Sequence, residues 1–197
     1  MADTLSDDAL DLIFRDARSY NGWLDKDVNE TQIQAIYDLM KMGPTSANQQ
    51  PARLVWCSSE DAKNRLAEHA SDANKDKIRN APVCVIIGYD VDFHEELPWL
   101  FPHADAKSWF EGDEGARVES ASRNSALQGA YLMIAARALG LDCGPMSGVD
   151  LDGVTREFFA DQPRHRADWI CSIGHGDKDS LFDRSPRPDF EKFNRVE

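Results

Sequence analysis

One uninterrupted apolar run, residues 82–90 with the sequence PVCVIIGYD, constrains the fold of this chain more than any other feature. Valine and isoleucine dominate its centre, and these β-branched residues favour strands. A strand with one face in water alternates apolar and polar residues, whereas a strand covered on both faces is apolar throughout. The run therefore predicts a strand inside a sheet that has other structure packed on both sides.

Helical and strand-like patterns alternate along the rest of the chain, with no internal repeat and no low-complexity tract. Ser6 is the predicted N-cap of the first helix and Thr31 that of the second, because short hydroxyl side chains accept hydrogen bonds from the first helical N–H groups. The predicted helices cover residues 6–16, 31–42, 59–69 and 117–140, and the predicted strands cover 54–57, 82–90 and 169–176. This order predicts one domain, 1–197, with a three-layer α+β or α/β architecture.

The longest helical pattern contains a stretch, residues 126–139 with the sequence ALQGAYLMIAARAL, that is apolar nearly all round. A helix without a polar face is buried on every side. Two kinds of cover are open at this point, which are a large core within one chain and a second subunit. Several alanines in the stretch leave room for another helix to approach closely.

The segment 91–116 interrupts the alternation of helices and strands, and five of the 18 aromatic residues of the chain lie in it. Long excursions of this kind are usually active-site covers or interface arms. We therefore expect a lid over the active site, and the alternative is that the segment only fills a gap in the core. The aromatic and histidine side chains that we expect to border a substrate pocket there are Trp99, Phe101, His103 and Trp109.

The balance of charge excludes several partners, because 35 acidic against 22 basic residues give a formal net charge of −13. Nucleic acids and anionic membrane surfaces require a basic face, so neither is expected. No apolar run approaches the ~20 residues that span a bilayer, and the acidic start MADTLSDDAL predicts no secretory signal. Four separated cysteines predict reduced core thiols and hence a cytoplasmic location. They are Cys57, Cys84, Cys143 and Cys171.

The first of three short motifs with binding chemistry is residues 17–23, ARSYNGW, just past the first predicted helix. Arg18 and Ser19 combine a guanidinium with a hydroxyl, which suits a phosphate group. Arg-Ser pairs are common, so an ordinary surface loop is the alternative interpretation.

The second motif is residues 43–51, GPTSANQQP, and it is the most specific of the three. Turn-forming and small hydrogen-bonding residues lie between two prolines and offer N–H groups and side-chain amides to a flat polar ligand. An ordinary turn from helix to strand needs fewer amides than Asn48, Gln49 and Gln50 supply, so we favour the binding interpretation.

The third motif is residues 144–148, GPMSG, which follows the long apolar helix. Glycine at both ends allows the backbone to approach a ligand closely. A simple connection between two helices is the alternative.

Several other kinds of site are not indicated. The five histidines lack the ligand spacing of a zinc helix, so no metal is predicted. No G-x-G-x-x-G follows a predicted strand, which argues against a dinucleotide-binding domain. No G-x-S-x-G is present, which argues against a hydrolase of that type.

The three motifs, in this order and with this helix between them, resemble those of the FMN-dependent nitroreductase family. The matching residues are Pro44-x-Ser46-x-Asn48-x-Gln50-Pro51, then Pro145-Met146-Ser147-Gly148, then the basic tail Arg184-Ser185-Pro186-Arg187. Within that family, the segments NGW, FPHADAKSWF, RNSALQGAYLMIAARALGLDCGPMSG and LFDRSPR resemble the malonic semialdehyde reductase branch of pyrimidine degradation. The resemblance covers essentially the whole chain.

The resemblance implies an α+β fold, a nitroreductase-like three-layer α/β/α sandwich with a central mixed sheet. It also implies a homodimer of the domain-swapped type, with FMN at the subunit interface and NADPH or NADH as hydride donor. Because no dinucleotide-binding domain is predicted, the nicotinamide would visit the flavin site only transiently.

The resemblance also implies roles for individual residues. Arg18 and Ser19 would lie at the FMN phosphate with a tail arginine, and the N–H groups near Ser147 and Gly148 at flavin N5. Ser46 and Asn48 would reach the flavin of the partner chain. The implied cofactor-binding residues are Arg18, Ser19, Asn21, Pro44, Thr45, Ser46, Asn48, Gln50, Pro145, Met146, Ser147, Gly148, Arg184 and Arg187.

Two positions depart from the family pattern. Ala17 stands where many members have an arginine, and Asn21 stands where they have a lysine or arginine facing the flavin. Reduced flavin carries negative charge near this cation, so its loss is expected to lower the reduction potential. The amide of Asn21 still donates hydrogen bonds, which is a weaker substitute.

The activity implied by the resemblance is reduction of malonic semialdehyde to 3-hydroxypropionate by ping-pong hydride transfer. Arg53 and His103 are the candidates for contacting the carboxylate and the carbonyl, and no catalytic acid is identified. Trp99, Phe101 and Trp109 would exclude water from the flavin. A reductase of broad specificity for nitro compounds and quinones, and a flavin-binding module without turnover, are the alternatives.

Overall fold

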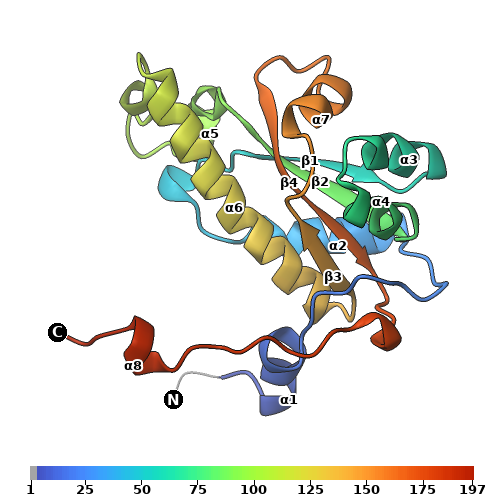
Figure 1. Ribbon diagram of the computed structural model, residues 1–197. Coiled ribbons are helices and arrows are strands. Elements are labelled where there is room, and N and C mark those ends of the chain that lie inside the picture. Colours follow the sequence, from blue (N-terminus) through green and yellow to red (C-terminus); the bar gives the residue numbers. More distant parts are fainter. Residues whose placement is uncertain (1–3) are drawn as a thin grey trace.

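A computed structural model of the protein describes residues 4–197 (Figure 1). The helices are α1 (Asp7–Leu10), α2 (Glu30–Met40), α3 (Glu60–Glu68), α4 (Asp72–Arg79), α5 (Leu97–Leu100), α6 (Glu114–Ala138), α7 (Leu151–Phe158) and α8 (Phe190–Phe193). Shorter π or 3₁₀ turns are η1 (Asp11–Arg15), η2 (Ser46–Asn48), η3 (Phe93–Glu96), η4 (Lys107–Phe110) and η5 (Lys178–Ser180). No helix in this part of the chain has the length and apolarity that crossing a bilayer requires.

The sheet consists of β1 (Ala52–Cys57), β2 (Val83–Asp90), β3 (Asp142–Met146) and β4 (His165–Gly174), in the order β1-β2-β4-β3. All neighbouring strands are antiparallel, so the expectation of a mixed sheet is wrong for these four strands. Strands alternating with helices along the sequence do not distinguish the two directions, because a helical connection can return the chain in either sense. Within the described residues, a parallel pairing exists only as an isolated bridge between Ser19, which lies outside the four strands, and Cys143 of β3.

The β2 strand explains the three layers. Its side chains alternate in direction, so Val83, Val85 and Ile87 pack on one face with α2 and α6. Cys84 and Ile86 pack on the opposite face with α3, α4 and α7. The long α6 runs across one side of the sheet, while α3, α4 and α7 gather together on the other side (Figure 1). The predicted three-layer α+β architecture and the strand covered on both faces are confirmed.

Capping residues set where the first two helices begin. The Ser6 hydroxyl accepts a hydrogen bond from Ala9 N at 3.2 Å, as predicted, but after four residues the helix widens into the π turn η1. Thr31 is not the cap of α2. Asn29 and Gln32 exchange hydrogen bonds between side chain and backbone, both of 3.0 Å, and this reciprocal pair starts the helix two residues earlier.

The α6 helix is only partly covered within one chain. Leu132, Ala135 and Ala136 lie in the core against the sheet. Leu127, by contrast, is 48% exposed, and Tyr131 and Leu139 are each 39% exposed. The alternative of a core within one chain is therefore insufficient to explain the apolar outer side of this helix.

The 91–116 segment has an inner and an outer side. Phe93 and Leu97 are fully buried and form a small core with Ala121 of α6. Trp99 and Trp109 are 75% and 60% exposed. The inner side therefore fills space in the core. The outer side carries the exposed tryptophans, and its role as a lid over the active site stays a prediction.

The four cysteines are buried free thiols, as predicted. Burial raises the pKa of Cys57 and of Cys84 to about 12, so both stay protonated at neutral pH.

Candidate functional site

The first and third motifs meet at the β3 edge of the sheet. Ser19 forms the isolated bridge with Cys143, and Tyr20 N donates to the Cys143 carbonyl at 3.0 Å. A Cβ atom at Gly144 would lie 2.5 Å from the Tyr20 carbonyl, so only glycine permits this approach. Burial and the nearby Asp142 raise the pKa of the Tyr20 phenol, while Arg18 opposes that shift.

A cavity of about 450 Å³, which we call the arginine cavity, lies where the first motif meets the C-terminal tail. Four guanidinium groups and the Ser19 hydroxyl line it, and Asp183 is the one carboxylate among its lining residues in the described chain. This donor set matches the chemistry of a phosphate group. The cationic and hydrogen-bonding side chains are Arg18, Ser19, Asn21, Arg137, Arg184, Ser185 and Arg187.

The loop and the tail are tied together by two reciprocal hydrogen bonds. Arg18 Nη2 donates to the Phe182 carbonyl at 2.5 Å, and Arg184 Nη2 donates to the Ala17 carbonyl at 3.2 Å. Arg187 donates only to carbonyls of its own segment, which are those of Ser185 and Pro186. Arg187 is therefore the tail arginine that does not also hold the two segments together.

Arg137 is a member of this cavity that the sequence analysis missed. It lies in the last turn of α6, and its Nη1 donates to the Ile13 carbonyl at 3.3 Å. Its buried Nε has no hydrogen-bond partner among the described residues. A basic residue near the C-terminal end of a helix is common because it complements the helix dipole, so no sequence signal distinguished it.

The first three residues of the third motif, 144–146, belong to strand β3, so the alternative of a simple connection between two helices is wrong. Pro145 and Met146 are the last residues of β3 and pair with Cys171 and Ile170. Proline is tolerated because β3 is an edge strand, where an N–H can be lacking without breaking a ladder. A small cavity of about 210 Å³ is lined by Pro145, Met146, Ser147 and Trp169.

Gly148 follows directly, and its carbonyl accepts from Ser71 N at 2.9 Å. A Cβ atom there would lie 2.8 Å from Asn74 Nδ2. Close packing against the start of α4 therefore keeps the backbone of the third motif in place.

The second motif lies at the opposite edge of the sheet, where it leads into β1. We call residues 44–51 the 44–51 loop. Ala47, Asn48 and Gln50 have φ angles of 49°, 49° and 41°. These angles lie in the left-handed region, which residues other than glycine rarely adopt. Each such residue costs on the order of 1–3 kcal/mol and persists only where its surroundings hold it.

Buried amides of α6 supply part of that support. Asn124 Oδ1 accepts from Ser46 N at 2.8 Å, and Gln128 Oε1 accepts from Ala52 N at 2.9 Å. Both amide side chains belong to residues that are only 3% exposed. The polar positions of α6, which an apolar interpretation of the helix overlooked, thus hold both ends of the loop.

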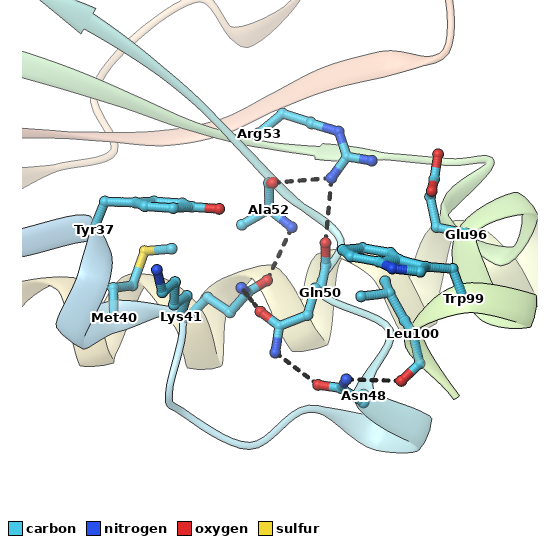
Figure 2. Close-up of a pocket in the computed structure, with 11 residues that line it drawn as sticks. Tyr37, Met40, Lys41, Asn48, Gln50, Ala52, Arg53, Glu96, Trp99 and Leu100 are labelled. Atoms are coloured by element: carbon cyan, nitrogen blue, oxygen red, sulfur yellow. Dashed lines mark hydrogen bonds between the residues drawn. The ribbon is translucent and has the colours of Figure 1, made fainter. Parts of the chain in front are cut away.

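A second cavity, of about 380 Å³, lies over the 44–51 loop, and we call it the loop cavity (Figure 2). It brings together Asn48 and Gln50 of the second motif with Arg53 and Trp99, two of the expected substrate-pocket residues. Three other expected pocket residues are not among its lining. Phe101, His103 and Trp109 form an aromatic cluster instead, with ring centroids 5.4 Å apart for Phe101 and His103 and 6.0 Å apart for Phe101 and Trp109.

The Arg53 guanidinium already donates several hydrogen bonds within the fold. Its Nη2 donates to Asp90 Oδ2 at 2.8 Å, and its Nη1 donates to carbonyls of the loop at 3.1–3.4 Å. Lys41, which the sequence analysis did not select, is the more exposed cation of this cavity and pairs with Asp38 at 2.5 Å. Its position on an ordinary amphipathic helix carried no sequence signal.

The half-buried carboxyl of Asp168 immediately precedes Trp169, a residue that lines the small cavity. Burial raises the pKa of Asp168, which precedes Trp169, and the Ser122 hydroxyl donates to its Oδ2 at 3.4 Å. In the part of the chain described, no three metal-binding side chains are grouped as a metal ion would require.

Comparisons with known proteins agree with these features. A family model described as Nitroreductase family matches residues 15–175. A Stenotrophomonas maltophilia protein, whose name assigns it as an NADH dehydrogenase/NAD(P)H nitroreductase, is 52% identical over 196 residues, 100% of both chains.

Solved structures show the same fold. A nitroreductase in complex with FMN from Exiguobacterium sibiricum has a TM-score of 0.84 and 20% identity, with 100% of both chains covered. An NAD(P)H:FMN oxidoreductase from Staphylococcus epidermidis has a TM-score of 0.85 and 17% identity, covering 100% of this chain and 99% of that one. At these identities the likeness concerns the fold alone.

Proposed function

Because this chain belongs to the nitroreductase family, we propose that it is an FMN-dependent NAD(P)H oxidoreductase that reduces malonic semialdehyde to 3-hydroxypropionate. The observation that carries the proposal is the arginine cavity, which joins the first motif, the tail and the β3 edge. Its four guanidinium groups and two serine hydroxyls suit a single phosphate. The four buried free thiols support a reducing, cytoplasmic location.

The residues present fit FMN. Arg18, Ser19 and Arg187 would hold the phosphate, and the N–H groups that follow β3 would bind the flavin edge. FMN, when bound, supplies a store of two electrons that it receives as hydride and passes to the second substrate. The amide of Asn21, in place of a cation, would leave the reduced flavin less stabilised.

We propose that each active site is shared between two copies of the chain. The arginine cavity and the 44–51 loop lie at opposite edges of a four-stranded sheet, and three strand spacings of about 4.8 Å separate these edges by roughly 14 Å. This separation supports a site in which the loop of one chain contacts the flavin that its partner holds. The exposed Leu127, Tyr131 and Leu139 of α6 support such an interface.

The loop cavity is the proposed substrate site. The Lys41 ammonium is the more exposed cation of the loop cavity, and it would exchange Asp38 for the carboxylate of the semialdehyde. The exposed Trp99 of α5 would exclude water once the partner chain is in place. Arg53, which holds Asp90 and the carbonyls at the end of the loop, is the second candidate for the carboxylate.

A broad nitroreductase or quinone reductase is the second candidate. The aromatic side chains of Tyr37 and Trp99 border the loop cavity, and such an opening admits flat aromatic rings (Figure 2). The name of the Stenotrophomonas relative agrees with this alternative equally well.

Stopped-flow reoxidation of the reduced protein tests the substrate. We expect malonic semialdehyde to reoxidise the flavin faster than propanal, a nitroaromatic, a quinone or oxygen. Lys41→Gln should raise KM for the semialdehyde about 10-fold, the effect of one charge-assisted hydrogen bond, and leave propanal unchanged. Faster reaction with the nitroaromatic or quinone supports the second candidate. A flavin that NAD(P)H does not reduce would leave only a binding module.

A further inference from the structure

Four hydrogen bonds form one continuous chain of amides beneath the loop cavity (Figure 2). Ala52 N donates to Gln128 Oε1 at 2.9 Å, and Gln128 Nε2 donates to Gln50 Oε1 at 2.6 Å. Gln50 Nε2 donates to Asn48 Oδ1 at 3.0 Å, and Asn48 Nδ2 donates to the Leu100 carbonyl at 2.9 Å. The amide chain therefore joins β1, α6, the 44–51 loop and α5.

The chain has only one possible direction. It begins at a backbone N–H, which can only donate, and ends at a backbone carbonyl, which can only accept. Each side-chain amide between these ends must accept on one side and donate on the other. If any one of the three amides were turned over, one of its contacts would pair two donors and the other would pair two acceptors. The two backbone ends therefore define the orientation of all three amides.

The 44–51 loop has other supports that do not involve this chain. Asn124 accepts from Ser46 N, and Gln49 Nε2 donates to the Ser120 hydroxyl at 3.2 Å. Arg53 holds the carbonyls at the end of the loop. The amide chain adds to these supports a hydrogen-bonded connection from α6 through the loop to α5, beside the apolar packing of Leu97 in the core that contains Ala121.

We propose that Gln128 is a positioning residue that sets α5 of the 91–116 segment relative to the 44–51 loop, and so sets the width of the substrate site between them. This inference rests on the proposed function for the identity of the substrate, but not for the connection itself. Gln128 is 3% exposed and is anchored at the β1 backbone. Gln128 is therefore the buried anchor of the amide chain, and the Leu100 carbonyl of α5 is its other end.

Two substitutions interrupt the chain at different links. Gln128→Met keeps the length of the side chain and removes both hydrogen-bonding atoms. Asn48→Asp keeps the acceptor for Gln50 and the tolerance for a positive φ, but removes the donor to the Leu100 carbonyl. Asn48 is exposed, so this second variant remains informative if Gln128→Met does not fold.

Hydrogen exchange of residues 97–101 measures the position of α5 without turnover. In each variant the amide hydrogens of this segment should exchange about 3- to 10-fold faster, because the loss of one net hydrogen bond corresponds to a change of this size. The double variant should exchange no faster than either single variant, because the same connection is already interrupted. Matched variants at exposed positions, Gln162→Met and Asn64→Asp, should leave the segment unchanged.

The steady-state readout is KM for the aldehyde, which should rise more than kcat falls in Gln128→Met. Unchanged exchange in both single variants, or additive acceleration in the double variant, would overturn the positioning role. If the protein reduces no aldehyde, the proposed substrate is wrong, and the exchange result still decides whether the amide chain holds α5.

Discussion

Individual arginines of this protein differ in which N–H groups the fold already uses. Arg53 donates to a carboxylate and to loop carbonyls, and Arg18 and Arg184 each donate to a carbonyl across the loop–tail contact. A guanidinium has five N–H donors, so one used for the fold leaves others for a ligand. The sequence identified most of these arginines by motif, but hydrogen-bond partners depend on tertiary contacts. Arg137 could not be found because it lies inside a helical pattern with no motif around it.

Arg187→Ala is expected to weaken FMN binding more than Arg184→Ala. Loss of a charge-assisted hydrogen bond costs about 1.5–3 kcal/mol, or about one to two decades of affinity. Arg184 also holds the Ala17 carbonyl, so its loss should additionally make the tail more sensitive to protease, which Arg187→Ala should not do. Flavin fluorescence titration measures the affinities, with Arg195→Ala as the control at an exposed tail position. Equal or reversed affinities would mean that the tail was assigned wrongly.

Among the structural elements, those with a regular pattern were the easiest to predict. The strand at 82–90 and the helix beginning after Ser59 agree closely with β2 and α3. The β3 strand was missed because its sequence, DCGPM, contains glycine and proline, which indicate a turn unless the strand is known to lie at an edge. The amides of α6 were missed because their partners are more than 70 residues away.

The start of the 91–116 segment is held by ion pairs from Arg164 to two carboxylates, those of Asp92 and Glu114. Arg164 donates through Nε and Nη2 to the two carboxylate oxygens of Asp92 at 2.9 and 3.1 Å, and through Nη2 to Glu114 at 3.0 Å. The hydrogen bonds from Arg164 hold the pKa of Asp92 below its usual value. The contact links the segment to the N-terminal end of α6 and to the residue before β4.

Asp92→Asn should lower the free energy of unfolding by about 0.5–1 kcal/mol at neutral pH, a modest value because both side chains are about one-third exposed. A carboxyl whose folded pKa is depressed stabilises the protein fully above its unfolded value, near 3.8, and loses that contribution as pH falls through the lower folded value. The difference from wild type should therefore be constant from pH 7 to 5 and shrink below pH 4. Urea unfolding across this range measures it, with the exposed Asp27→Asn as control. A difference that grows toward low pH would contradict the assignment.

At the scale of the whole molecule, the motifs are divided between the two edges of the sheet. Exposed apolar side chains lie on α2, on α6, in the 91–116 segment, on the first helical turns and on the tail. The tail runs past α1 and extends away from the sheet (Figure 1). The sequence predicted the apolar helix and the resemblance implied the dimer. That the second motif lies at the other edge from the first and third depends on strand order, which no local pattern specifies. Examples of the exposed side chains are Phe14, Leu127, Tyr131, Phe182 and Phe193.

The protein is expected to sediment as a dimer at sub-micromolar concentration, since interfaces of this obligate kind commonly bury about 2,000–5,000 Å² or more. Leu127→Glu should shift it toward monomer and weaken FMN binding together, because a charge would be buried in the interface. Added FMN should raise the melting temperature of the wild type by mass action. Leu24→Glu, at a leucine that is 53% exposed beside Lys63 and Asn80, is the matched control. A stable wild-type monomer that retains FMN and turns over would exclude the shared site.

The proline in β3 has a consequence for how the protein behaves when crowded or partly unfolded. An open strand edge presents N–H and carbonyl groups in a row, on which a strand from another molecule can be added to begin a fibril. On the β3 edge Pro145 has no N–H to offer, and the Cys143 carbonyl is already occupied by Tyr20 N. The same residues that bring the first motif to the sheet therefore remove a template for fibril growth at the β3 edge, one of the two edges of this sheet.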